Sequence, residues 1–517
     1  MKDSIVKFNE MRGIGDCSKV CHAPFQSLYF GQTGGVVACC YNRKNILGRY
    51  PDESIMDIWT GSKATEMREG MLSDSSLPMG CDNCADQLIA ENFMGLHAKK
   101  YDVYSAPSEE AAEARLVDLG DRGKVAFPKL IEFELSNACN LECVMCHGGF
   151  SSSIRKNREN LPLLPNPYDA EFVRQLDDFI PHLEEAKFLG GEPFIIGVYY
   201  DIWDRMIELK PDIVTSITTN GSILNKRIKR IVERLNVIIV MSIDSMVRET
   251  YNKIRINSDF DQVQRSIEYY IGQCRAKGQR LAFATCPITL NWREMPDILK
   301  YCNDNDLSIF FNTVFHPRHV SLRYLPSTEL AEIVDVYEQV MPVANTDSQR
   351  SNVRCFNDLV KQVKQWHREA VAAEEEAAKP DTWPDWHLRT EDKLRGDWQV
   401  SEVARQLSEQ WQKADPNDYD FSFLKAMRAE VAEDYSFMNY FHYGVFLAYS
   451  DRENLDEATR ADLRLKAEFL FQNWENYSDR DAYIEAVIAT DPAPMMERAV
   501  AVPLEKMRYE PLLVVQW

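Results

Sequence analysis

Residues 139–146, CNLECVMC, place three cysteines in one short stretch, in the pattern Cys-x3-Cys-x2-Cys. The number of thiols is informative, because disulfides need cysteines in pairs and a structural zinc site usually takes four ligands. Three thiols in one loop therefore indicate a metal site with one coordination position left open for another molecule. A zinc site and a chance cluster of cysteines are the alternatives.

The chain around this loop alternates apolar strand patterns with helical patterns. Strands that are nearly continuous apolar runs, each followed by a helix, predict a parallel sheet with right-handed crossovers. The predicted strands are 129–135, 185–190, 213–219, 236–243, 280–288 and 307–315, and the intervening helices include 169–180, 222–235, 259–278 and 291–304. Six units are too few for a closed eight-fold barrel and indicate an α/β fold with a partial (β/α)6 TIM-like barrel. The three-cysteine loop would then follow the first strand, at the edge where α/β folds carry their chemistry.

Polar and glycine motifs follow the next three predicted strands. Glycine lets backbone approach a ligand closely, a glutamate can accept from an ammonium group, and a guanidinium suits a carboxylate. The motifs are GGEP, TTNG, SID and YNKIRIN, with the candidate residues Gly190, Gly191, Glu192, Pro193, Asn220, Ser242, Asp244 and Arg255. Together with the three-cysteine loop, this ordered series resembles the radical S-adenosylmethionine (SAM) superfamily.

The resemblance assigns roles to these residues. Cys139, Cys143 and Cys146 would hold three irons of a [4Fe–4S] cluster, whose open iron binds the amino and carboxylate groups of SAM. The GGEP motif would contact the SAM amino group, and Arg255 would pair with the SAM carboxylate. The residues at the ends of the third and fourth strands would reach the ribose and methionine portions. Met145 departs from the family pattern, which usually has an aromatic residue before the last cysteine.

A second set of cysteines precedes this region. The pattern Cys21-x13-Gly35-x4-Cys40, followed by Cys81-x2-Cys84, resembles the auxiliary-cluster module called SPASM, or its shortened twitch form. The resemblance implies one auxiliary [4Fe–4S] cluster, held by Cys21, Cys40, Cys81 and Cys84. Cys39 and Cys40 are adjacent, and the spacing after the glycine favours Cys40. A structural zinc ribbon is the alternative. The module more often follows the barrel in this family, whereas here it comes first.

Four segments follow from these patterns. Residues 1–100 form a SPASM/twitch-like auxiliary-cluster domain, 101–127 a polar linker, 128–326 the radical SAM partial barrel and 327–517 a mainly helical C-terminal region. Substrate recognition is a possible role for that last region.

Composition and charge narrow the partners and the compartment. A formal net charge of −21 argues against a nucleic-acid-binding surface, which would be basic. No apolar stretch approaches the ~20 residues of a membrane span, and the first residues lack a secretion signal. We therefore expect a cytoplasmic protein, in which the 13 cysteines are reduced thiols or metal ligands.

The resemblance also implies an activity. Such enzymes receive an electron from a flavodoxin- or ferredoxin-type donor, cleave SAM to a 5′-deoxyadenosyl radical and abstract a hydrogen atom from the substrate. The auxiliary cluster would accept an electron from the substrate radical, which predicts an oxidoreductase that modifies a peptide or protein. Dehydrogenation of a small molecule, such as a sugar or aminocyclitol, is the alternative. A non-catalytic iron–sulfur scaffold or electron carrier is the alternative from another class.

Overall fold

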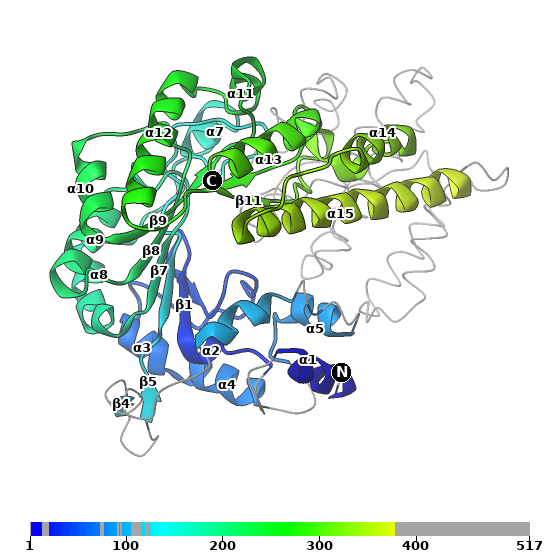
Figure 1. Ribbon diagram of the computed structural model, residues 1–517. Coiled ribbons are helices and arrows are strands. Elements are labelled where there is room, and N and C mark those ends of the chain that lie inside the picture. Colours follow the sequence, from blue (N-terminus) through cyan, green and yellow to red (C-terminus); the bar gives the residue numbers. More distant parts are fainter. Residues whose placement is uncertain are drawn as a thin grey trace, which may run out of the picture.

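The computed structural model describes residues 2–12, 20–72, 77–89, 93, 96–104, 116–118 and 124–377. Most of the predicted C-terminal region, from residue 378 onward, lies outside the described residues. The centre of the described part is a nine-stranded sheet with the order β11-β10-β9-β8-β7-β6-β1-β2-β3 (Figure 1).

Six strands of this sheet are the six that the sequence predicts. They are β6 (Leu130–Phe133), β7 (Glu185–Phe188), β8 (Val214–Thr219), β9 (Asn236–Ser242), β10 (Ala282–Thr285) and β11 (Ser308–Phe311). Each pairs in parallel with the next along the chain. The α/β fold class is thereby confirmed. Their carboxyl ends lie at one edge of the sheet, because all six run in the same direction.

Helices between the strands cover one face of the sheet, on the left in Figure 1. The helices of the parallel region are α7 (Ser152–Asn157), α8 (Ala170–Gln175), α9 (Gly197–Leu209), α10 (Lys226–Arg234), α11 (Arg248–Ile254), α12 (Phe260–Ala276) and α13 (Met295–Asp304). Along β7, β8 and β9, fully buried residues alternate with partly exposed ones. This period of two puts the apolar side chains under the helices and leaves polar ones, such as Lys187 and Ser216, on the inner face.

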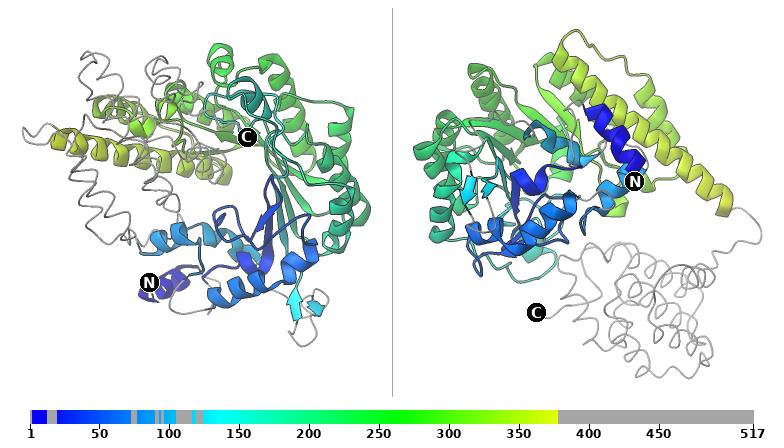
Figure 2. Two further views of the ribbon diagram at one scale, coloured as in Figure 1. Left: turned by 180° about the vertical axis from the view of Figure 1, so that it is seen from behind. Right: turned by 90° about the horizontal axis from the view of Figure 1, so that it is seen from below.

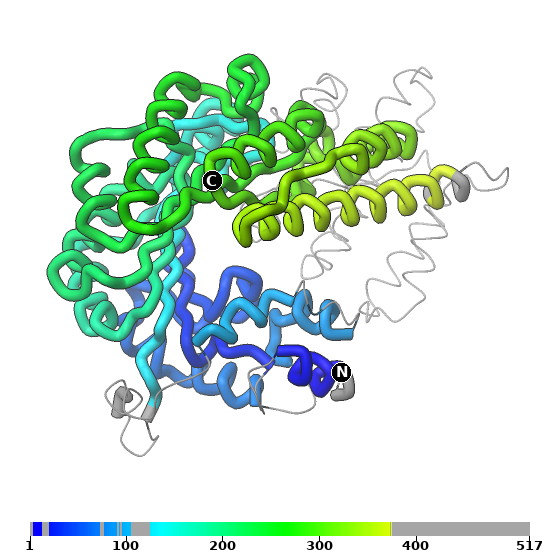
Figure 3. The backbone as a smooth tube through the Cα atoms, in the orientation of Figure 1, coloured from blue at the N-terminus to red at the C-terminus, as the bar shows by residue number. Residues whose placement is uncertain are grey.

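The N-terminal segment is built onto the same sheet. Its strands are β1 (Ser27–Phe30), β2 (Gly35–Val37) and β3 (Gly48–Arg49), and β1 lies parallel to β6 with Phe30 opposite Phe133. The Phe30 ring stacks on Phe133 at 5.9 Å between centroids and meets Phe172 edge-on at 5.1 Å. Figure 3 shows the backbone of this segment beside β6. One hydrophobic core therefore extends from the N-terminal segment into the parallel region.

The described chain has further elements before, within and after the parallel region. At the N-terminal end are α1 (Lys2–Arg12), α2 (Ala23–Gln26), α3 (Ile55–Thr60), α4 (Ser62–Met71), α5 (Asp82–Ile89), and the short strands β4 (Leu116–Asp118) and β5 (Lys124–Ala126). Short 3-10 helices include His97–Tyr104, Leu176–Asp178, Ile180–His182, Trp292–Glu294, Arg318–Val320 and Leu322–Tyr324. Helices α14 (Ser327–Glu338) and α15 (Asp347–Ala377) pack together beyond β11 (Figure 2). Within the described residues, no helix combines the length and the apolar character that crossing a bilayer requires.

Candidate functional site

The three-cysteine loop begins just beyond the carboxyl end of β6 and is held on both sides. The Ser153 hydroxyl donates to the Cys139 carbonyl at 2.8 Å, which fixes the loop to the start of α7. On the other side, the backbone N–H groups of Glu142 and Val144 donate to carbonyls at and just beyond the end of α11, each at 3.0 Å. The loop therefore has a defined conformation between two parts of the chain that are about 100 residues apart.

The three thiols lie close enough to influence one another. Burial raises the pKa of Cys139 to about 11, and the neighbouring Cys143 adds to the shift. Burial also raises the pKa of Cys146, with further contributions from Cys143 and Cys139. Three buried sulfur atoms in electrostatic reach of one another disfavour bare thiolates, and a bound cationic metal centre reverses that preference. The donor set thus fits an iron–sulfur cluster.

A glycine turn after β7 lies directly against this loop. Gly190 has φ = +104°, and a Cβ atom there would lie 2.5 Å from the Ser136 carbonyl oxygen. A Cβ atom on Gly191 would lie 2.2 Å from the carbonyl oxygen of Ala138. Both positions therefore require glycine, because any larger residue would push the turn away from the loop that begins at Cys139.

Glu192 connects the turns after β7 and β8. Its carboxylate is fully buried and accepts hydrogen bonds from the Thr219 hydroxyl and the Asn220 backbone N–H, both at 2.7 Å. A third, from the backbone N–H of Phe194, is 3.2 Å long. Burial raises the pKa of Glu192 to about 7, although these donors oppose the shift. In this structure the glutamate fixes the geometry of the turns, and its contact with the ammonium group of SAM stays a prediction.

Replacing Glu192 with alanine should therefore destabilise the fold. The Asn220 N–H and the Thr219 hydroxyl would lose a buried acceptor, and the expected loss is about 2–4 kcal/mol in the free energy of unfolding. Urea denaturation of the wild type and of Glu192→Ala measures it. Glu249→Ala is the matched control, because the Glu249 side chain is 79% exposed, and its effect should stay within about 0.5 kcal/mol. An equal loss in both variants would contradict the bridging role.

Asn220 follows β8 and reaches the cysteine loop. Its side-chain amide donates to the Asn140 side chain at 3.2 Å and lies 4.0 Å from the Cys139 sulfur. Asn140 in turn donates to the Ser222 hydroxyl at 2.9 Å. Asn140 and Ser222 were not among the predicted site residues, because an asparagine inside a cysteine motif and a serine after Asn-Gly look like ordinary turn residues.

The last part of this edge comes from β9 and the segment after α11. Ser242 is the final residue of β9, and Asp244 lies two positions beyond it. Arg255 forms an ion pair with Asp244 at 2.7 Å, and its guanidinium lies 3.9 Å from the Cys143 sulfur. Burial lowers the pKa of Arg255, but Asp244 and Cys143 outweigh that effect and raise it overall. The arginine lies beside the loop with Asp244 as its carboxylate partner, and its pairing with the SAM carboxylate stays a prediction.

The N-terminal cysteines form a second group, with one change from the expectation. Cys21, Cys39, Cys81 and Cys84 line a single small apolar cavity together with side chains that include Met67, Met71 and Leu77. Burial raises the pKa of Cys21, and Cys39, Cys84 and Cys81 each add to the shift, so these four thiols face one another.

Cys40, which the spacing favoured, lies outside this cavity lining. Its sulfur is 3.5 Å from the Nε2 atom of His97. Burial raises the pKa of Cys40 to about 12, and the negative charge of Glu132 is the next largest cause of this shift. Adjacent residues project their side chains in different directions, which a count of residues cannot show. The lining of the cavity makes Cys39 the candidate for the fourth thiol of an auxiliary cluster, beside the Cys40 that the spacing predicts.

Within the described residues, no three His, Cys, Asp or Glu side chains are arranged to ligate a single metal ion. A four-iron cluster is a different requirement, because each thiolate binds a different iron and the sulfur atoms lie further apart than around one ion.

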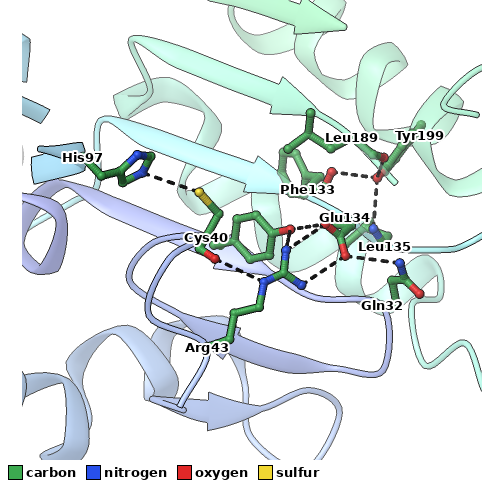
Figure 4. Close-up of polar contacts among 10 residues, drawn as sticks. Gln32, Cys40, Arg43, His97, Phe133, Glu134, Leu135, Leu189 and Tyr199 are labelled. Atoms are coloured by element: carbon green, nitrogen blue, oxygen red, sulfur yellow. Dashed lines mark hydrogen bonds and ion pairs between the residues drawn. The ribbon is translucent and has the colours of Figure 1, made fainter. Parts of the chain in front are cut away.

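A polar cluster joins the half-exposed Arg43 to the buried Tyr29 and Glu134. Arg43 binds the Glu134 carboxylate through both terminal nitrogens, at 3.1 and 3.3 Å, and donates to the Tyr29 hydroxyl at 2.7 Å (Figure 4). Burial lowers the pKa of His147, the residue after Cys146, and the charge of Glu134 acts in the opposite direction. The Glu134 carboxylate is therefore within electrostatic reach of the cysteine loop. The alternation of Glu132 and Glu134 with apolar residues in the first predicted strand was the available signal for this cluster.

Comparison with known proteins identifies the class. The family model described as "Radical SAM superfamily" matches residues 133–302, and the SPASM model, described as "Iron-sulfur cluster-binding domain", matches residues 21–85. Residues 133–302 are therefore a radical SAM domain, and a SPASM-type domain precedes it. These two domains imply a SAM-binding [4Fe–4S] cluster, SAM and an auxiliary iron–sulfur cluster as the cofactors.

Named relatives match a part of the chain. A GTP 3′,8-cyclase of Limosilactobacillus fermentum is 27% identical over 195 residues, which are 35% of this chain and 52% of that protein. The molybdenum cofactor biosynthesis protein moc-5 of Caenorhabditis elegans is 26% identical over 38% of this chain and 29% of its own length. The chain thus spans about half the length of the first curated relatives it matches.

Solved structures with similar folds include anSMEcpe with bound AdoMet, at 16% identity and a TM-score of 0.32 over 40% of this chain and 59% of that one. Streptococcus suis SuiB bound to S-adenosylmethionine is 18% identical, with a TM-score of 0.31 over 54% of this chain and 58% of that one.

Proposed function

We propose that SAM binds at the carboxyl edge of β6–β9 and that the enzyme uses it to abstract a hydrogen atom from a substrate held on the inner face of the sheet. One observation carries this proposal. The three-thiol loop, the glycine turn, Asn220 and the Asp244–Arg255 pair come from four successive strands and contact one another at a single edge. An iron–sulfur scaffold or electron carrier would need the thiols and none of the other groups.

The residues of this edge have distinct roles in the proposal. Cys139, Cys143 and Cys146 hold the cluster. The turn at Gly190 and Gly191 brings backbone polar groups next to the cysteine loop, where they can bind the amino group of SAM. When bound, the cluster and SAM supply the reductive cleavage that yields the 5′-deoxyadenosyl radical.

Arg255 offers a cation for the SAM carboxylate, and its bond to Asp244 holds the guanidinium in position before SAM arrives. The Arg255 and Asp244 side chains are only 8% and 0% exposed, so water is largely excluded from this pair. Exclusion of water both strengthens the electrostatic contact and protects a reactive radical from solvent.

The inner face between the two groups of thiols is the proposed place for the substrate. It carries the Arg43–Glu134–Tyr29 cluster, and the Arg43 side chain is 49% exposed, so it can also contact a bound molecule. A polar substrate there would lie between the site of hydrogen abstraction and the auxiliary cluster, which would accept an electron in an oxidative reaction.

Two substrate classes are compatible with this position. Oxidative modification of a peptide or protein is the outcome that the auxiliary domain predicts. The curated relatives named GTP 3′,8-cyclase favour a small molecule instead, and a nucleotide in particular, as the second candidate.

Anaerobic incubation of the reconstituted enzyme with SAM and dithionite tests the proposal. Formation of 5′-deoxyadenosine is expected, and its absence from enzyme with a full complement of iron would exclude the activity. Addition of GTP then separates the two substrate classes. Faster 5′-deoxyadenosine formation with consumption of GTP would support the nucleotide, whereas an effect only with a peptide would support peptide modification.

A further inference from the structure

Helix α10 carries a dense group of positive charges on an otherwise acidic chain. Five of its nine residues are basic, namely Lys226, Arg227, Lys229, Arg230 and Arg234, against the single acidic residue Glu233. The whole chain has 59 basic and 80 acidic residues, so this density does not reflect the overall composition. The apolar residues Ile228, Ile231 and Val232 face the core, and four of the five basic residues are exposed.

The arrangement of these charges disfavours the helix itself. Basic residues at its first turn oppose the helix dipole, which favours negative charge at that end. Lys226 and Arg230, like Arg230 and Arg234, are four positions apart, where like charges repel. Acidic side chains neutralise only part of this positive charge. Arg230 forms an ion pair with Asp204 of α9 at 3.0 Å, and its side chain is still 54% exposed. Repulsive charges retained on a surface helix indicate a role outside the fold.

The start of α10 lies near the three-cysteine loop. Asn225 caps the helix, accepting from the Ile228 N–H at 3.0 Å, and follows the turn in which Ser222 accepts from Asn140 of the cysteine loop. Arg227 lies 3.9 Å from the centre of the Tyr200 ring, and the Tyr200 hydroxyl donates to the Phe194 carbonyl, next to the GGEP turn. Two routes of direct contact therefore join the basic helix to the loops of the proposed SAM site. Figure 1 shows α10 in the outer layer, beside α9.

We propose that the exposed basic face of α10 is the docking site of an acidic electron-carrier protein, which delivers the electron that SAM cleavage requires. This inference rests on the proposed function. The radical reaction needs one electron from outside, and the start of α10 lies near the cysteine loop, so a carrier bound there is brought towards the cluster. A positive patch attracts a negatively charged carrier and accelerates association, which suits a small and transient interface. The rest of the acidic surface would repel such a carrier and direct it to this helix.

A charge-reversal variant tests this inference. The triple variant Lys226→Glu, Arg230→Glu, Arg234→Glu changes exposed residues that lie outside the proposed binding site. With reduced flavodoxin as the donor at low ionic strength, the initial rate of 5′-deoxyadenosine formation should fall at least about tenfold. With dithionite, a small reductant that needs no docking, the rate should stay within about twofold of the wild type. The affinity for labelled flavodoxin, measured by fluorescence anisotropy, should fall in parallel.

The matched control makes the same change of charge on other helices. Arg174→Glu, Lys300→Glu, Lys361→Glu alters side chains that are 70%, 72% and 76% exposed on α8, α13 and α15. This control should keep the flavodoxin-driven rate, and raising the ionic strength from about 0.02 to 0.3 M should slow the wild type towards the α10 variant. An equal loss in the control, or no loss in the α10 variant, would overturn the inference.

A second variant guards against a folding defect in the first. Glu233→Lys makes the same helix more basic, and it should raise the flavodoxin-driven rate or its resistance to salt. If the triple variant misfolds, the Glu233→Lys variant decides. Unchanged flavodoxin kinetics and binding in Glu233→Lys would then reject the docking site. Binding of anionic lipid vesicles to α10 without any effect on flavodoxin would assign the patch to another partner. Wild-type enzyme that forms no 5′-deoxyadenosine with dithionite would instead disprove the proposed function.

Discussion

Replacing Cys139, Cys143 and Cys146 with alanine should abolish the formation of 5′-deoxyadenosine and remove about four irons per chain. These thiols are the proposed ligands of the cluster that binds SAM, and buried alanines offer no donor in their place. Product analysis by liquid chromatography, together with iron and sulfide determination, measures both effects. Loss of activity should be complete, because no other described thiol lies in the same loop.

A matched control uses a cysteine in the same domain. Cys302 is a fully buried member of the hydrophobic core on α13, so a Cys302→Ala variant should retain iron and SAM cleavage. Wild-type rates of 5′-deoxyadenosine formation in the triple variant would contradict the assignment of the loop. Equal loss of iron in the Cys302 variant would show that the effect is one of folding rather than of ligation.

The second large effect should distinguish Cys39 from Cys40. The wild type should carry about eight irons and negligible zinc, and the triple variant of the radical loop should keep about four. In that background, Cys39→Ala should leave a three-thiol site with one exposed iron, and most of the remaining iron should be lost to a chelator. Cys40→Ala should retain its iron, because the Cys40 sulfur lies beside His97 and outside the cavity of the other four thiols.

Metal analysis after chelator treatment checks this prediction, and the auxiliary cluster's electron paramagnetic resonance signal gives an independent readout. The opposite result, with iron lost only in the Cys40 variant, would restore the ligand set that residue spacing favoured. One zinc with four irons in the wild type would make the N-terminal group a structural zinc site. An oxidative reaction would then lack its electron acceptor, since zinc does not change its oxidation state.

The parallel sheet and the main site were predictable from local patterns. The apolar runs before Cys139 and before Asn220 are bounded by turn residues and alternate with helices. This alternation predicts parallel strands, whose carboxyl ends share one edge of the sheet. The glycines at 190 and 191 were informative because their backbone conformation and close approach allow no other residue. These features depend on neighbours in the sequence, which a single chain displays.

Other features depend on contacts that the sequence does not display. The pairing of β1 with β6 joins segments about 100 residues apart, and the run SLYF gives no indication of its partner. The choice between Cys39 and Cys40 is decided by side-chain direction in a bend. The bonds of Glu192 to Thr219 and Asn220 are another such contact, because only the folded backbone brings these two residues to the glutamate.

The parallel contact of β1 with β6 also constrains the order in which the chain can assemble. During synthesis β1 emerges first, yet its neighbour β6 follows only after about 100 further residues, and closing such a loop costs about 4 kcal/mol of chain entropy. Leu28 and Phe30, which are fully buried in the finished core, stay uncovered during this interval. The buried strand β1 of the auxiliary-cluster segment therefore gains its full cover only after the first strand of the radical SAM domain has been made.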